Sequence, residues 1–166
     1  MNTISRILQQ PEYIHTAINH FPLIGLFIAM LAVIAGLVAR SKPATVIGLS
    51  LLAATALSIW PVFEYGEAGF DRVLSMSDDP GQVYLKYHSQ LAHRWVFLYY
   101  VTAVLAALTL ALTWKWPAIL LPGSILSLAL AVASLAAGIY IARAGGEIRH
   151  REFRFGPAPL VQDAGG

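Results

Sequence analysis

The sequence predicts an all-α protein, an integral membrane four-helix bundle made of two helical hairpins. Of the 166 residues, 57% are hydrophobic and only 12% are charged. Soluble globular domains have about 45–50% apolar residues and about 25% charged residues. Four stretches are apolar over about 20 residues, the length a helix needs to cross a hydrocarbon core about 30 Å thick. None of them contains a charged residue, and small residues recur within each, which lets helices pack closely in lipid. The predicted spans are residues 21–39, 44–63, 95–113 and 118–142.

The first long helix is expected to begin before its span. Pro11 suits a first helical position, and Pro22 predicts a kink where the helix enters the apolar stretch. Arg40-Ser-Lys-Pro43 is too short for anything but an antiparallel turn into the second span. After that span, Glu64 to Asp78 contains Gly and Ser residues and predicts an ordered loop with one short helix.

The third long helix is expected to begin at Asp79 as N-cap, with Pro80 in its first turn. Trp114-Lys-Trp-Pro117 is again a short turn, and Gly145-Gly146 should end the fourth helix. Residues 1–150 are therefore predicted to form one transmembrane domain, followed by a polar tail over 151–166. An aromatic belt at the membrane boundary accounts most simply for Trp60, Trp95, Tyr99 and Tyr100.

A weak internal repeat links the two hairpins. His15 and His20 precede the first span and His88 and His93 precede the third, at an offset of 73 residues in both cases. Parallel repeats of this kind indicate a pseudo-twofold axis along the membrane normal. Because the number of spans is even, both termini and the long middle connection share one face, and the histidines lie there. The axis is expected to bring equivalent histidines toward each other.

The histidine spacing limits how these residues could share a cofactor. Side chains five residues apart on one helix differ by about 140° in direction and about 7.5 Å in height, so ligands to one centre should come from different helices. His20 with His93 is the preferred pair, as axial ligands of a b-type haem, with one or two haems in all. His15 and His88 then serve another haem or support the first. Arg94, Arg149 and Arg151 could hold the haem propionates through charge-assisted hydrogen bonds.

A non-haem metal centre is the alternative that the same residues leave open. Neutral imidazoles suit copper, iron or zinc, and the candidate metal ligands are His15, His20, His93 and His150. His150 complicates a simple two-ligand haem, because a fifth histidine leaves three imidazoles without a role. With no cysteine in the chain, covalent c-type haem, iron–sulfur clusters and thiolate zinc sites are excluded.

Several of these residues carry a family resemblance. His15-Thr-Ala-Ile-Asn-His20-Phe-Pro22, Ala92-His93 and Gly145-Gly-Glu-Ile-Arg-His150 resemble the motifs of an uncharacterised bacterial family of four-helix membrane proteins that opens with His-Pro-x-x-x-His-Phe-Pro. Thr16 departs from that pattern, where the family has proline. Some family members are fused to Rieske iron–sulfur or cytochrome c domains. The resemblance implies a redox role, b-haem binding, and His15, His20, His93 and His150 as ligands; His88 depends on the repeat alone.

The function predicted from sequence is membrane electron transfer, an electron carrier or subunit more than a stand-alone enzyme. It would exchange electrons with quinol or with a redox protein partner. The competing hypothesis is a small accessory subunit of a larger membrane complex, with a metal ion or no cofactor. The net charge of +2 argues against nucleic-acid binding. We expect a multi-pass protein of the bacterial inner membrane. A count of basic residues favours a cytoplasmic histidine face, but Arg94, Arg149 and Arg151 on that face are candidate ligand-binding residues, so we place the histidine face and both termini in the periplasm.

Overall fold

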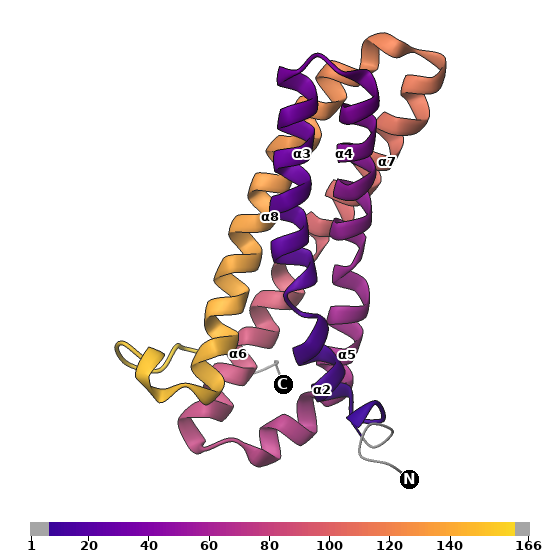
Figure 1. The fold of residues 1–166 in the computed structure, drawn as a ribbon. Coiled ribbons are helices and arrows are strands. Elements are labelled where there is room, and N and C mark those ends of the chain that lie inside the picture. Colours follow the sequence, from indigo (N-terminus) through magenta and orange to yellow (C-terminus); the bar gives the residue numbers. More distant parts are fainter. Residues whose placement is uncertain (1–6, 162–166) are drawn as a thin grey trace.

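The computed structural model describes residues 7–161, and within that range the chain is helical and has no strand (Figure 1). Four continuous segments are long and apolar enough to cross a membrane. They are Pro11–Val38, Lys42–Met76, Asp79–Lys115 and Pro117–Arg149. The predicted all-α class and the four membrane-length helices are therefore confirmed.

The first segment consists of α2 (Pro11–Ile18), the π-helical turn η1 (Phe21–Gly25) and α3 (Leu26–Val38). The predicted start at Pro11 is confirmed. The interruption expected at Pro22 takes the form of the π turn, since proline has no N–H to offer the regular ladder of hydrogen bonds. Turns of this type occur frequently at functional sites.

The second segment consists of α4 (Lys42–Leu57) and α5 (Ile59–Met76), so the loop predicted from Glu64 to Asp78 is wrong. The glycines that indicated a loop instead lie against α2. A Cβ on Gly69 would come 3.0 Å from the Glu12 backbone nitrogen, and one on Gly66 would come 3.0 Å from His15 Nδ1. A glycine costs a helix only about 1 kcal/mol relative to alanine, and close packing against α2 offsets that cost.

The third and fourth segments differ from prediction at two boundaries. They contain α6 (Asp79–Trp95), α7 (Phe97–Lys115), the 3-10 turn η2 (Pro117–Ile119) and α8 (Leu120–Arg149), with a last 3-10 turn η3 (Arg151–Phe153). The N-cap of α6 is Asp78 and not Asp79, since Asp78 Oδ1 accepts a hydrogen bond from Gly81 N at 3.0 Å. Gly145-Gly146 do not end the fourth helix, which continues to Arg149. Gly145 lies within α8, where it packs on the His88 ring of α6.

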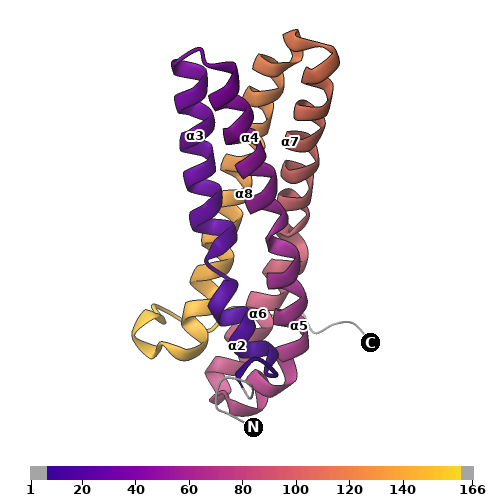
Figure 2. The ribbon, with the colours of Figure 1, turned by 45° about the vertical axis from the view of Figure 1, so that its right-hand side comes forward.

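The helices pack differently at the two ends of the molecule. Toward the short connections, α3 packs on α4, α4 on α7, α7 on α8, and α8 on α3 (Figures 1 and 2). At the other end α2 packs on α5 and α6 packs on α8. This second end also holds the connection between α5 and α6 and the turn after α8.

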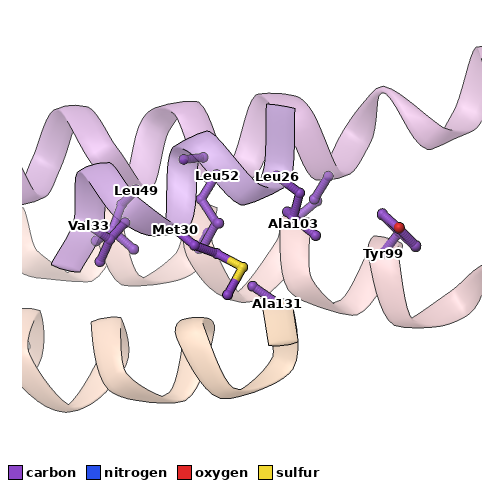
Figure 3. Close-up of a cluster of buried hydrophobic side chains, with 11 residues drawn as sticks. Leu26, Met30, Val33, Leu49, Leu52, Tyr99, Ala103 and Ala131 are labelled. Carbon is purple, nitrogen blue, oxygen red and sulfur yellow. The ribbon is translucent and has the colours of Figure 1, made fainter. Parts of the chain in front are cut away.

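The larger of the two buried hydrophobic clusters lies in the half with the short connections, and a smaller one lies between α6 and α8 at the other end. Leu26, Leu49, Leu52 and Tyr99 are fully buried in the larger cluster, as Figure 3 shows, with smaller side chains filling the spaces between them. A Cβ on Gly48 would come 2.6 Å from the Val33 nitrogen, so this glycine lets α3 and α4 approach closely.

The outer surface of this half is apolar, as a lipid-facing surface must be. The exposed large hydrophobic side chains include Leu31, Ile34, Val38, Val104, Leu108 and Val132. Inside, a buried hydrogen bond of 2.9 Å joins the hydroxyls of Thr102 on α7 and Ser134 on α8. This buried pair is thus satisfied within the bundle while large apolar side chains face outward, an arrangement that suits a bilayer.

The segment after α8 is attached to the helices through Arg154. Its guanidinium donates to both carboxylate oxygens of Asp78 at 3.2 Å and to the carbonyl oxygens of Glu147 and Ile148 at 2.7 Å. The hydrogen bond from Arg154 holds the pKa of the Asp78 carboxyl below its usual value. The predicted tail therefore begins with an anchored stretch, and residues 162–166 of that tail lie outside the described residues.

Candidate functional site

A cavity of about 480 Å³ lies among α2, α5, α6 and α8, at the end of the molecule away from the short connections. Its walls are mostly apolar side chains, and a small number of polar side chains reach it. The polar or titratable ones are Glu12, Tyr13, His15, Thr16, Asn19, Tyr65, Glu67, Arg72, His88, Ser89, Tyr99 and Arg149. A largely apolar cavity with a few convergent polar groups is typical of a ligand or cofactor site.

His15 and His88 line this cavity and are held in the same way. His15 Nδ1 lies 2.8 Å from the Val62 carbonyl oxygen, and His88 Nδ1 lies 2.9 Å from the Ile141 carbonyl oxygen. A carbonyl oxygen only accepts, so each Nδ1 carries the proton and donates it. The Nε2 atom of each ring is then left with a lone pair, the form in which histidine binds a metal ion.

Each imidazole also lies against a glycine of the helix that accepts its hydrogen bond. The glycine stands four residues after the accepting carbonyl in both cases: Gly66 follows Val62, and Gly145 follows Ile141. A Cβ on Gly66 would come 3.0 Å from His15 Nδ1, and one on Gly145 would come 3.2 Å from His88 Nδ1. A larger residue at either position would require the ring to shift by a few tenths of an ångström. The two halves of the chain thus build the same histidine setting twice.

The two histidine rings lie close together in the cavity lining, in an edge-to-face arrangement. Their ring centroids lie 6.4 Å apart and their planes are nearly perpendicular, at 85°. The offset of 73 residues that relates them in sequence therefore corresponds to a real juxtaposition of the two halves. His15 on α2 lies against α5, and His88 on α6 lies against α8. Because α5 and α6 also contact each other, the two histidines come together.

The other predicted histidines lie elsewhere, and none of them lines the cavity. His20 is exposed, just before the π turn. His93 is also exposed, and its Nε2 lies 3.1 Å from Glu67 Oε2. His150 is exposed beyond α8, where its Nδ1 lies 3.0 Å from Glu152 Oε1. The preferred pairing of His20 with His93 stays a prediction, and no described contact joins these two residues.

The three predicted arginines are divided between the cavity and the outer surface. Arg149 is exposed but lines the cavity. The Arg94 guanidinium stacks over the Trp95 ring at 5.3 Å, and Arg151 Nη2 lies 3.0 Å from Asp78 Oδ2. A fourth arginine, which the sequence did not single out, is Arg72: it lines the cavity, with its Nε 2.9 Å from Glu12 Oε1.

Tyr99 and Asn19 are two of the polar cavity residues that the sequence interpretation missed. Tyr99 is not part of an aromatic belt: it is fully buried, it lines the cavity, and its hydroxyl has no hydrogen-bond partner among the described residues. The Asn19 side-chain oxygen is also buried and unpartnered there. Gly138 makes room for the Tyr99 hydroxyl, since a Cβ at that position would overlap it. No sequence signal separates Tyr99 from its neighbour Tyr100.

The described residues do not gather three or more His, Asp or Glu side chains at one point where they could hold a metal ion. Comparison of the chain with protein-family models, with curated proteins and with solved structures finds no match. The cavity and the paired histidines are therefore the features of the molecule that bear on its function.

Proposed function

We propose that this protein is a membrane electron-transfer protein that holds a b-type haem between His15 and His88. The observation that carries the proposal is the pair itself: two imidazoles from the two halves of the chain, close together in one cavity, each with its Nδ1 bonded to a backbone carbonyl. The proposal changes the preferred pair from His20 and His93 to the two histidines that line the cavity.

The spacing of the two rings supports this assignment. A nitrogen ligand of this kind lies about 2.0–2.1 Å from its metal ion. If both Nε2 atoms were directed at one metal ion, the two ring centroids would lie about 6.3 Å apart, given a centroid-to-nitrogen distance of about 1.1 Å. The observed separation is 6.4 Å.

The surroundings of the rings also suit an axial ligand. Metal-bound histidines almost always donate the other ring N–H to a carbonyl or carboxylate, which fixes the tautomer and the orientation of the ring. His15 and His88 have this partner in Val62 and Ile141. The paired glycines Gly66 and Gly145 give each ring its place on the neighbouring helix.

Charge at the cavity supports the same cofactor. Arg149 lines the cavity and would bind a propionate by charge-assisted hydrogen bonds; Arg72 also lines it but is paired with Glu12 at 2.9 Å. Of the arginines expected in this role, Arg149 keeps it, whereas Arg94 and Arg151 have partners elsewhere. A haem in this site would supply one-electron chemistry, and the protein would tune it through burial, axial ligands and nearby charge.

The proposal includes the setting in the cell and the electron partners. The four membrane-length helices support a multi-pass protein of the bacterial inner membrane, and we place its histidine face in the periplasm because the arginines there are candidate ligand-binding groups rather than topology signals. Quinol in the bilayer or a redox protein at the histidine face would donate electrons. The repeated histidine setting supports two parallel-repeat hairpins as the architecture behind it.

Two pairs of variants test the proposal, because each ligand histidine has a matched control five residues away. His15→Ala and His88→Ala should each abolish or reshape the haem absorbance of the purified protein, whereas His20→Ala and His93→Ala should keep it, since both control residues are exposed and outside the cavity. Loss of haem only in the His20 and His93 variants would overturn the assignment. Colourless wild-type protein that purifies only with a larger complex would favour the accessory-subunit hypothesis.

A further inference from the structure

A second cavity lies at the opposite end of the molecule from the paired histidines, between the two short connections (Figures 1 and 2). It has a volume of about 320 Å³, and its lining residues are drawn from 36–45 and 117–121. We call it the connection recess. Because it lies at the ends of the membrane-length helices, it is placed where lipid headgroups meet water.

The charged residues that line the connection recess are both basic. They are Arg40 and Lys42, and both are exposed, so their charges are accessible to a ligand. The sequence has no Asp or Glu from 21 to 63 or from 95 to 142. No acid of the predicted spans or of the short connections therefore balances these two charges, and the recess is suited to an anion from outside the chain.

Arg40 has a backbone conformation that an arginine rarely adopts. Among the described residues it is the one non-glycine residue with a positive φ, at 50°. It follows the C-cap of α3, where hydrogen bonds from Arg40 N to Leu37 O and from Ser41 N to Gly36 O form a Schellman turn. Glycine is the usual residue at this position, because a Cβ makes the left-handed conformation costly. An arginine kept there despite the strain indicates a role for its side chain.

The rest of the lining favours a phosphate group that carries apolar chains. The recess includes the start of α4, and the positive end of a helix dipole attracts an anion. Its apolar wall includes Leu121, which is 58% exposed and so continues onto the lipid-facing surface. The periplasmic placement proposed for the histidine face puts the recess at the cytoplasmic side, where basic pockets between membrane helices bind lipid headgroups.

We propose that the connection recess binds the headgroup of an anionic phospholipid. The Arg40 guanidinium donates charge-assisted hydrogen bonds to the phosphate oxygens, and Lys42 supplies a second positive charge. The acyl chains lie along the apolar surface beside Leu121. The bound lipid bridges the two short connections, and its binding does not require haem.

The test uses the full-length protein in detergent, titrated with phosphatidylglycerol as the anionic probe and with phosphatidylcholine as the zwitterionic control. A ligand that binds the folded state raises the unfolding temperature once its concentration exceeds its Kd, so the titration gives the affinity. The wild type should show saturable stabilisation by phosphatidylglycerol and none by phosphatidylcholine. Arg40→Gln and Lys42→Gln should each weaken binding about 5-fold, the effect of one basic residue near an anionic lipid surface.

Lys115→Gln is the matched control. Lys115 has the same charge at the same end of the molecule, but it does not line the recess, and its Nζ lies over the Trp116 ring at 5.0 Å. This variant should bind phosphatidylglycerol as the wild type does. Equal losses in all three variants would indicate a diffuse attraction to the lipid and would overturn the inference. Equal stabilisation by phosphatidylcholine, or by inorganic phosphate at the same concentration, would also overturn it.

Arg40→Gly separates lipid binding from folding. Glycine relieves the left-handed strain, so the unfolding temperature of the lipid-free variant should rise, whereas its affinity for phosphatidylglycerol should fall as in Arg40→Gln. A variant that is more stable and still binds the lipid as tightly as the wild type would show that the Arg40 side chain does not hold the headgroup, and would refute the inference.

Discussion

Replacing Gly138 by alanine tests the most crowded contact of the cavity. The new Cβ would overlap the Tyr99 hydroxyl, well inside the 3.0 Å that Cβ atoms essentially never cross. Tyr99 is fully buried among the core residues (Figure 3), so its ring has little room to withdraw. Overpacking of this kind costs about 1–3 kcal/mol, and the better helix propensity of alanine returns up to about 1 kcal/mol.

The companion change Tyr99→Phe removes the atom that clashes. The nearest ring atom to the new Cβ is then Cζ, at 3.2 Å, which a shift of a few tenths of an ångström relieves. In the ligand-free protein Tyr99→Phe alone should be neutral or slightly stabilising, because it removes an unpartnered hydroxyl. The double variant should therefore recover most of the stability that Gly138→Ala loses.

The assay is a double-mutant cycle on the free energy of unfolding, measured in detergent for the four proteins. The helix propensity of alanine cancels in the cycle, so the coupling energy reports the clash. We expect a coupling of about 1–2 kcal/mol in favour of the double variant, within the range found for residues in contact. Effects that add to within about 0.5 kcal/mol would show that the Tyr99 hydroxyl does not point at Gly138.

The structure supports two further predictions. The folded-state pKa of Asp78 is lowered by Arg154, so the stability it contributes is present above its usual pKa of 3.8 and is lost as the pH falls through the lowered value. The unfolding temperature should then drop more between pH 5 and pH 3 in the wild type than in Asp78→Asn, and parallel curves would count against the ion pair. Gly66→Ala should displace the His15 ring, whose Nδ1 would lie 3.0 Å from the new Cβ, and should shift the redox midpoint potential of bound haem. The same potential in this variant would argue that His15 is not an axial ligand.

The spans were predictable because lipid imposes a simple rule. About 20 apolar residues and satisfied backbone hydrogen bonds are needed to cross a bilayer, and four stretches of this sequence meet the rule. Pro11 marked the first helix start for an equally local reason. The loop expected from Glu64 onward did not appear, because Gly66 and Gly69 are turn signals only until a packed helix needs their small size.

The site was predictable only in part. The repeat identified both histidine pairs, and the five-residue spacing implied that only one member of each pair could face a shared centre. Spacing does not reveal which member that is: His15 and His88 face the cavity because α5 and α8 pack on their side of α2 and α6. The role of Tyr99 depends on tertiary packing against Gly138, which leaves no mark in the local sequence.

The most direct test of the central claim is the reduced-minus-oxidised visible spectrum of the purified wild-type protein, with metal analysis of the same sample. A bis-histidine haem between His15 and His88 predicts the bands of a low-spin b-type cytochrome and one iron per chain, both absent from His15→Ala. A featureless spectrum, whether with stoichiometric copper or zinc or with no metal at all, would contradict it.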